Sequence, residues 1–248
     1  MKPITPPPAL RGVLWDMDGT VIDSEPYWLE AETKLVESYG GVWTPQQTLD
    51  LTGLDLHDTA GALQRSGVPL ATEELIHTLV GMVRDLFMAA PLWRPGIRRA
   101  LAECAQAKLA CALVSMSWRH FTEAVCDLAP GAFAAIVSGD DVKRGKPEPE
   151  AYLVGAAKLG LAPAECLVIE DSPTGVASAL AAEMATIAVP NAGCAVAPAD
   201  GLTILDSPKQ LSVRLMREIH SRHWATRPSS RRTADTGPGT STSRRAAL

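Results

Sequence analysis

Five short apolar runs recur along the chain, each followed by polar or turn-forming residues. They occupy 10–15, 109–114, 134–137, 166–169 and 186–189. The runs do not alternate between apolar and polar positions, which is typical of parallel strands that are covered on both faces. Segments of helical length lie between them, at 96–107, 118–128, 149–159 and 173–183. This alternation predicts an α/β fold with a Rossmann-like, doubly wound parallel sheet as its core.

The segment from 24 to 90 breaks the alternation, because it has helical periodicity but no convincing strand. Two sets of apolar residues recur at spacings of three and four: Trp28, Ala31, Leu35 and Tyr39 form one set, and Leu75, Leu79, Met82 and Leu86 form the other. Each set predicts one face of an amphipathic helix. We therefore expect an all-helical module inserted after the first strand. Its two crossings, near 23–26 and 89–95, would form a pair of hinges.

Length and composition are compatible with this organisation. A chain of 248 residues, 46% hydrophobic and 21% charged, can form one large domain with an insertion or two small domains. The pattern favours the insertion. We expect an extended lead-in over 1–9, an α/β core over 10–23 and 91–220, a helical cap over 24–90 and a tail over 221–248.

Charge is distributed unevenly along the chain. The tail has six arginines and one acid, so it carries +5, and the net charge of −5 leaves −10 on residues 1–220. The polar tail is expected to be disordered, and the acidic body argues against nucleic-acid binding. No apolar run approaches the roughly 20 residues of a membrane span, and prolines replace the apolar stretch of a secretory signal. The five dispersed cysteines are expected to be reduced, so we predict a cytoplasmic protein.

Chemically active side chains follow the predicted strands at their carboxyl ends, where open parallel sheets bind ligands. Asp16 and Asp18 follow the first strand, Ser115 the second, and Glu170 and Asp171 the fourth, while Lys146 lies in a Gly-Lys-Pro turn. Acids that converge in this way repel one another unless a cation lies among them, and oxygen ligands suit Mg²⁺. A magnesium ion beside a lysine would bind phosphate oxygens. The pattern therefore predicts a Mg²⁺-assisted phosphate site.

Four motifs carry a resemblance to a known family. They are Asp16-Met17-Asp18-Gly19-Thr20, Leu113-Val114-Ser115, Gly145-Lys146-Pro147-Glu148-Pro149 and Ile169-Glu170-Asp171-Ser172. In this order and spacing the chain resembles the haloacid-dehalogenase-like phosphohydrolases from residue 10 to about 219. Within that family it is similar to the branch of β-phosphoglucomutase and the small phosphosugar phosphatases. The segment Ser-Glu-Pro-Tyr-Trp at 24–28 resembles the hexose- and hexitol-phosphate phosphatases.

The resemblance implies a phosphatase that acts through an aspartyl-phosphate. Asp16 matches the nucleophile, and Asp18 matches the general acid and base. Ser115 matches the hydroxyl that donates to a phosphoryl oxygen, together with the backbone amides of Met17, Asp18 and Met116. Lys146 matches the cation that stabilises the phosphoryl oxygens and holds Asp16.

The same resemblance implies a Mg²⁺ site. Asp16, the carbonyl of Asp18 and Asp171 match its protein ligands. Glu170 is expected to support these ligands from behind, or to bind the metal directly on occasion.

The helical insertion would close over the site as a cap and contact the substrate. The candidate contacts are Trp28, Thr52, Gly53 and Asp55. A cap loop with an acid and no cation suits a sugar or sugar alcohol better than a second phosphate. The expected partner is therefore a small phosphorylated metabolite.

Four alternatives to this activity are less well supported by the sequence. Haloacid dehalogenases and phosphonate-cleaving relatives lack the second acid of the first motif, so Asp18 favours phosphate esters. A β-phosphoglucomutase would have His in place of Trp28 and an Arg near Leu56, so a mutase is the weaker alternative. A non-catalytic binding module could lose Asp16 or Asp18, and this chain keeps both.

Overall fold

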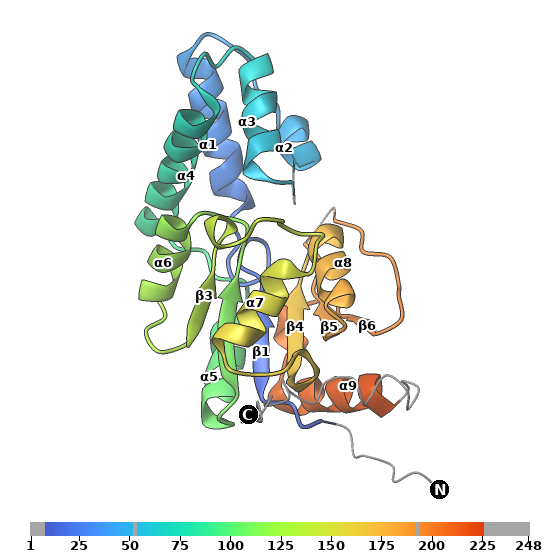
Figure 1. The fold of residues 1–248 in the computed structure, drawn as a ribbon. Helices are drawn as coiled ribbons and strands as arrows, with labels where there is room; N and C mark the ends of the chain where they lie inside the picture. The colour runs from blue at the N-terminus through green and yellow to red at the C-terminus, as the bar shows by residue number, and fades with distance from the viewer. Residues whose placement is uncertain (1–7, 52–53, 192–193, 226–248) are drawn as a thin grey trace, which may run out of the picture.

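The computed structural model describes residues 8–51, 54–191 and 194–225, and its α/β core is built on one parallel sheet (Figure 1). The strands are β1 (Gly12–Trp15), β2 (Ala110–Val114), β3 (Ala135–Val137), β4 (Cys166–Glu170), β5 (Ala185–Ala188) and β6 (Leu202–Ile204). They lie in the order β3-β2-β1-β4-β5-β6, and every neighbouring pair is parallel. The doubly wound fold class is thus confirmed. The order reverses beside β1, where such sheets bind their ligands.

Helices cover both faces of the sheet. On one face α7 (Glu150–Lys158) and α8 (Pro173–Ala181) pack against the strands, and on the other lie α5 (Ile97–Gln106), α6 (Arg119–Asp127) and α9 (Val213–Ala225). Successive strand residues point to opposite faces, so Leu14 belongs to the cluster under α7 while Trp15 belongs to the larger cluster on the other side. Both side chains are fully buried, which explains the continuous apolar runs.

Four further helices form a separate layer above the carboxyl edge of the sheet (Figure 1). They are α1 (Glu25–Ser38), α2 (Pro45–Leu51), α3 (Leu56–Arg65) and α4 (Thr72–Ala89). We call this layer the cap. It lies within the segment where the sequence predicted an all-helical insertion.

The predicted helix faces in the cap are correct except at one position. Ala31, Leu35, Leu75 and Leu79 are buried, and Met82 and Leu86 are half-buried against the same cluster. Tyr39, in contrast, is 44% exposed and lies beyond the end of α1. The helix ends there because the chain turns at Gly40, whose φ of 78° lies in the left-handed region.

The two chain crossings between core and cap lie side by side. Ile22 forms an antiparallel bridge with Trp93. The amide of Asp23 donates to the carbonyl of Leu92 at 2.9 Å, and the amide of Arg94 donates to the carbonyl of Val21 at 3.1 Å. The crossings are therefore hydrogen-bonded to each other.

Two elements differ from the prediction. Strand β6 was not predicted, because it has only three residues and none of them is buried. Helix α9 continues to Ala225, so the predicted start of a tail at 221 is wrong; Trp224 is buried and anchors this last turn. The rest of the predicted tail, 226–248, lies outside the described residues, as does most of the predicted lead-in, 1–7.

Three short 3-10 helices complete the described elements: η1 (Gly139–Asp141), η2 (Pro163–Glu165) and η3 (Pro208–Gln210). Among the described residues, no helix combines the length and the apolar character needed to cross a bilayer.

Candidate active site

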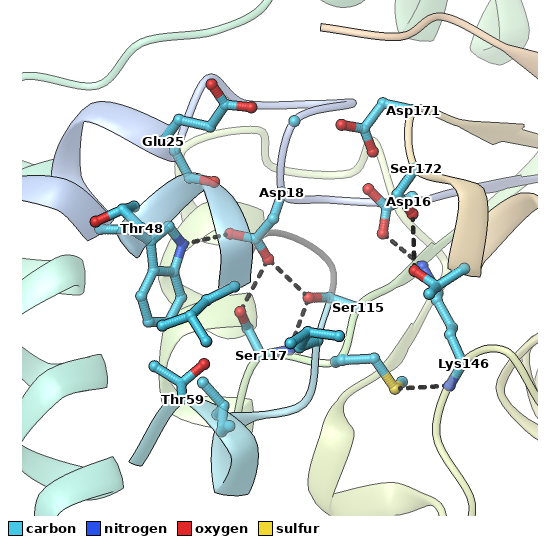
Figure 2. Close-up of a pocket in the computed structure, with 18 of the residues that line it drawn as sticks. Asp16, Asp18, Glu25, Thr48, Thr59, Ser115, Ser117, Lys146, Asp171 and Ser172 are labelled. Atoms are coloured by element: carbon cyan, nitrogen blue, oxygen red, sulfur yellow. Dashed lines mark hydrogen bonds and ion pairs between the residues drawn. The ribbon is translucent and has the colours of Figure 1, made fainter. Parts of the chain in front are cut away.

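A cavity lies between the carboxyl edge of the sheet and the cap, and most of the predicted site residues line it (Figure 2). Asp16 and Asp18 come from the turn after β1, Ser115 and Met116 follow β2, and Asp171 follows β4. These strands are neighbours in the sheet, so their carboxyl ends bring the side chains together. Lys146 also lines the cavity, from the loop that precedes α7.

Lys146 joins two carboxylates at the floor of the cavity. Its Nζ lies 2.5 Å from Asp16 Oδ1 and 2.7 Å from Glu170 Oε1, and it also donates to the carbonyl oxygen of Val114 at 3.2 Å. The side chains of all three charged residues are less than 10% exposed. Burial alone would lower the pKa of Lys146, but the charges of Asp16 and Glu170 raise it above its usual value. The lysine is therefore a permanent cation at neutral pH.

Asp16 presents its second carboxylate oxygen to the site. Oδ2 is buried and has no hydrogen-bond partner within the part of the chain that the structure describes. Burial raises the pKa of Asp16 to about 7, although Lys146 acts in the opposite direction. An orphaned, buried carboxylate oxygen is costly unless a cation or a reacting group meets it. Asp16 Oδ2 is thus a carboxylate oxygen of the site that a cation or a reacting group could meet.

The acids at this edge fit a divalent cation. Ligand oxygens of Asp16, Glu170 and Asp171 lie within 4.8 Å of one another. Burial, together with the charges of Asp16 and Glu170, raises the pKa of Asp171 well above its usual value. A hard cation such as Mg²⁺ relieves such repulsion, since it binds carboxylate oxygens.

Both carboxylate oxygens of Glu170 accept hydrogen bonds from neighbouring residues of the site. Its Oε1 accepts from Lys146 and from the Tyr152 hydroxyl, and its Oε2 accepts from the amides of Asp171 and Ser172 and from the Ser172 hydroxyl. Burial acts against the charged form, but Lys146 outweighs it, so the pKa of Glu170 is lowered. Glu170 is thus held as an anion whose oxygens are already used, and Asp16 and Asp171 are better placed as metal ligands.

Two glycines leave room for these carboxylates. A Cβ on Gly19 would lie 2.1 Å from Asp171 Oδ2, and the φ of Gly19 is 79°. A Cβ on Gly175 would lie 1.6 Å from Glu170 Oε1. The motif glycine after Asp18 is therefore required both by its backbone conformation and by the close approach of Asp171.

Asp18 is held by three donors on the other side of the cavity (Figure 2). Its Oδ2 accepts from the hydroxyls of Ser115 at 3.0 Å and Ser117 at 2.8 Å, and its Oδ1 accepts from Trp28 Nε1 at 3.3 Å. The Ser115 oxygen in turn accepts from the Ser117 amide at 2.9 Å. Trp28 belongs to α1, so the cap contacts Asp18 directly.

Of the predicted cap contacts that the structure describes, one lines the cavity and one does not. Trp28 lines the cavity as predicted. Asp55 has another role: its carboxylate accepts from the amides of His57 and Asp58 as the N-cap of α3, and the cavity is lined by its neighbours Leu54 and Leu56 instead. Thr52 and Gly53 lie outside the described residues.

Several cavity residues were not predicted from the sequence. Ser117 follows Ser115 by two positions in the bend after β2, and both hydroxyls donate to Asp18 Oδ2. In the cap, Glu32, Thr48 and Thr59 also line the cavity. Glu32 follows Trp28 by four positions, which is one helical turn.

Fold and site together define a class: an α/β enzyme core with a helical cap, in which a buried aspartate, a lysine and an acidic cluster meet at the strand ends. The family model described as haloacid dehalogenase-like hydrolase matches residues 10–183. The chain belongs to this family of hydrolases.

Relatives of the chain include two hexitol phosphatases of Escherichia coli. The chain is 33% identical to hexitol phosphatase B of Escherichia coli over 190 residues, which cover 74% of this chain and 85% of that protein. It is 36% identical to hexitol phosphatase A of the same organism over 190 residues, 72% of this chain and 82% of that protein. A solved structure of a putative β-phosphoglucomutase from Thermotoga maritima superposes with a TM-score of 0.64 at 27% identity, covering 81% of this chain and 96% of that one.

Proposed function

We propose that this protein is a Mg²⁺-dependent phosphatase that hydrolyses a small sugar phosphate or sugar-alcohol phosphate through an aspartyl-phosphate. The observation that carries the proposal is Asp16, whose Oδ1 is held by Lys146 at 2.5 Å while its buried Oδ2 is left without a partner among the described residues. One oxygen of the nucleophile is thus fixed and the other is free to react.

In the first half-reaction Asp16 Oδ2 attacks phosphorus. A bond forms between this oxygen and phosphorus, and the bond from phosphorus to the ester oxygen breaks. Lys146 stabilises the charge that develops on the phosphoryl oxygens. Asp16, Asp171 and the carbonyl of Asp18 would hold Mg²⁺, which would supply positive charge beside the incoming phosphate.

Asp18 acts as the general acid in the first step and as the general base in the second. It gives a proton to the leaving alcohol oxygen in the first step and takes one from the attacking water in the second, which breaks the bond between phosphorus and Asp16 and releases inorganic phosphate. Ser115 and Ser117 hold its Oδ2 and Trp28 holds its Oδ1, so the acid stays beside the cavity in both steps. When the Ser115 hydroxyl turns from Asp18 to a phosphoryl oxygen of bound substrate, Ser117 and Trp28 still hold Asp18.

The substrate class rests on the relatives and on the cap. Hexitol phosphatases A and B are relatives by sequence. The described cap residues that line the cavity supply carboxylates, hydroxyls and apolar groups but no cation. Such a lining favours the neutral, hydroxyl-bearing end of a polyol over a second phosphate, which a phosphomutase has to bind. We propose a cytoplasmic location for this activity, on metabolites and not on nucleic acid.

The test is phosphate release from a panel of sugar, polyol, nucleotide and small-acid phosphates, with Mg²⁺ and with EDTA. We expect release from polyol or sugar phosphates only with Mg²⁺, no release by Asp16→Asn, and unchanged release by Asp127→Asn, an exposed acid on α6 that serves as the matched control. Conversion of glucose 1-phosphate to glucose 6-phosphate faster than phosphate release would make the protein a mutase instead.

A further inference from the structure

The cap places a buried carboxylate in the cavity wall, away from the phosphate chemistry. Glu32 lies on α1, is 2% exposed and lines the same cavity as Asp16. No lysine or arginine pairs with it within the part of the chain that the structure describes. Burying a carboxylate without a cation costs free energy, so the position of Glu32 in the cavity wall has to be explained in another way.

Only one of its two oxygens is satisfied. Oε2 accepts from Trp43 Nε1 at 3.1 Å and from the Thr48 hydroxyl, whereas Oε1 accepts no hydrogen bond from any described residue. Oε1 is thus the free oxygen of a side chain that lines the cavity. Burial raises the pKa of Glu32 despite the two donors. The side chain is therefore held rigidly, with one acceptor free.

The remaining lining determines which ligand can meet that acceptor. Among the described lining residues Lys146 is the one cation, and its Nζ is already shared by Asp16 and Glu170. Glu25 adds a second acid on the cap side (Figure 2). A negatively charged group in the cap would thus meet two carboxylates, whereas a hydroxyl would meet a free acceptor.

The position of Glu32 on α1 relates it to the reaction centre. It lies one turn from Trp28, whose indole donates to Asp18 at 3.3 Å. A substrate whose ester oxygen lies beside Asp18 therefore extends along α1 toward Glu32. Leu51 and Leu54 line the same space with apolar groups, which suit the carbon chain of such a substrate.

We propose that Glu32 is a specificity-determining residue, whose Oε1 accepts hydrogen bonds from substrate hydroxyls remote from the phosphate and so selects polyol phosphates over bisphosphates. This inference rests on the proposed phosphatase function and adds to it the group that recognises the far end of the substrate.

The test compares two kinds of substrate on Glu32→Gln. The variant keeps the shape and an oxygen for Trp43 and Thr48, but it presents an amide donor where Oε1 accepted. For a hexitol phosphate we expect kcat/KM to fall about 10- to 100-fold, as loss of a hydrogen bond to a charged group implies. For phenyl phosphate, whose organic group has no hydroxyl, we expect kcat/KM to change less than about twofold, as for a substitution that removes no specific contact. Glu30→Gln, an exposed acid on the same helix, is the control and should leave both values unchanged.

A second arm removes the substrate hydroxyl and leaves the enzyme intact. The wild type should lose activity toward analogues that lack hydroxyls at the end remote from the phosphate, and Glu32→Gln should be indifferent to the same change. The wild-type measurement in this arm is informative even if the variant folds poorly. Equal losses of Glu32→Gln on hexitol phosphate and phenyl phosphate would assign Glu32 a structural role, and no loss on either would also overturn the proposal.

Failure of the proposed function would look different. If the wild type hydrolyses nothing, the affinity of hexitol phosphate for Asp16→Asn and for Asp16→Asn with Glu32→Gln, measured by calorimetry with Mg²⁺, still tests the subsite. Weaker binding by the double variant supports the proposal, and equal binding refutes it. If the wild type hydrolyses phenyl phosphate but no polyol phosphate, the hydrolase chemistry stands and the polyol subsite does not.

Discussion

Replacing Lys146 with methionine should destabilise the protein in a way that depends on pH. The ammonium group lies 2.5 Å from Asp16 and 2.7 Å from Glu170, and at an effective dielectric constant of about 20 Coulomb's law gives about 6 to 7 kcal/mol for each pair. The cost of burying the lysine offsets much of this attraction. Removal of one partner from a buried pair typically costs about 3 to 5 kcal/mol, because the charge left behind has no compensation.

The sign of the pH dependence follows from the carboxylates. In the wild type the pKa of Glu170 is lowered below 4.5, with Lys146 outweighing burial, so its ionised form stabilises the fold above that pH. In Lys146→Met the cation that outweighed burial is lost, and hydrogen bonds such as those from Tyr152 and Ser172 alone oppose burial at Glu170, so we expect the pKa of both Glu170 and Asp16 to rise. Ionisation then costs stability, and the cost grows as pH rises. The variant should thus lose more stability at pH 8 than at pH 5.5.

Urea unfolding in EDTA, followed by tryptophan fluorescence, measures this loss, since Trp15 is buried in the sheet beside the site. Lys143→Met, an exposed lysine of the same loop, is the matched control and should change stability by less than about 0.5 kcal/mol. The reasoning is refuted if Lys146→Met loses less than about 1 kcal/mol at pH 8, a typical surface value, or loses the same amount at both pH values.

Three further outcomes are expected. Asp16→Asn should be more stable than the wild type in EDTA at pH 8, by on the order of a few kcal/mol. Burial raises the pKa of Asp16 from 3.8 to about 7, so the wild type loses stability as pH rises through this range, and the loss is complete above it. Equal urea midpoints of the two proteins at pH 8 would contradict this. Trp28→Phe should lower kcat about tenfold through loss of the donor to Asp18, with the unfolding midpoint nearly unchanged; an unchanged kcat would show that the indole is not needed to hold the acid. Gly19→Ala should weaken Mg²⁺ binding in calorimetric titrations, because its Cβ would meet Asp171 Oδ2 at 2.1 Å, whereas Gly81→Ala, in open space on α4, should not.

The parts of the site that the sequence predicts are those fixed by strand ends. Asp16 and Ser115 each follow a buried strand directly, and parallel strands bring their carboxyl ends to one edge, so pattern alone places them together. Lys146 is 130 residues from Asp16 along the chain and follows no predicted strand directly; its Gly-Lys-Pro turn suggested its place in the site, and the resemblance to a family suggested its role.

The parts that the sequence does not predict depend on packing. Charged residues of amphipathic helices usually face solvent, but Glu32 is buried within the cap, where it accepts hydrogen bonds from Trp43 and Thr48. Asp55 was predicted to contact the substrate, but it lies at the N-terminus of α3. Its carboxylate accepts hydrogen bonds from the first backbone amides of that helix and so acts as the N-cap. Strand β6 has too few residues and too little burial to leave a hydrophobic pattern.

The pairing of Ile22 with Trp93 has a mechanical consequence. Hydrogen bonds join the outgoing and returning crossings, so the cap is attached through a two-stranded ribbon and not through two independent tethers. A ribbon bends readily about the axis that crosses its strands but resists shear and rotation in its own plane. We expect such a ribbon to limit the cap to a single hinge direction, so that a cap that opens and closes would return Trp28 and Glu32 to the same register over Asp16. Discrimination between substrates of different length would then be as reproducible as in a rigid pocket.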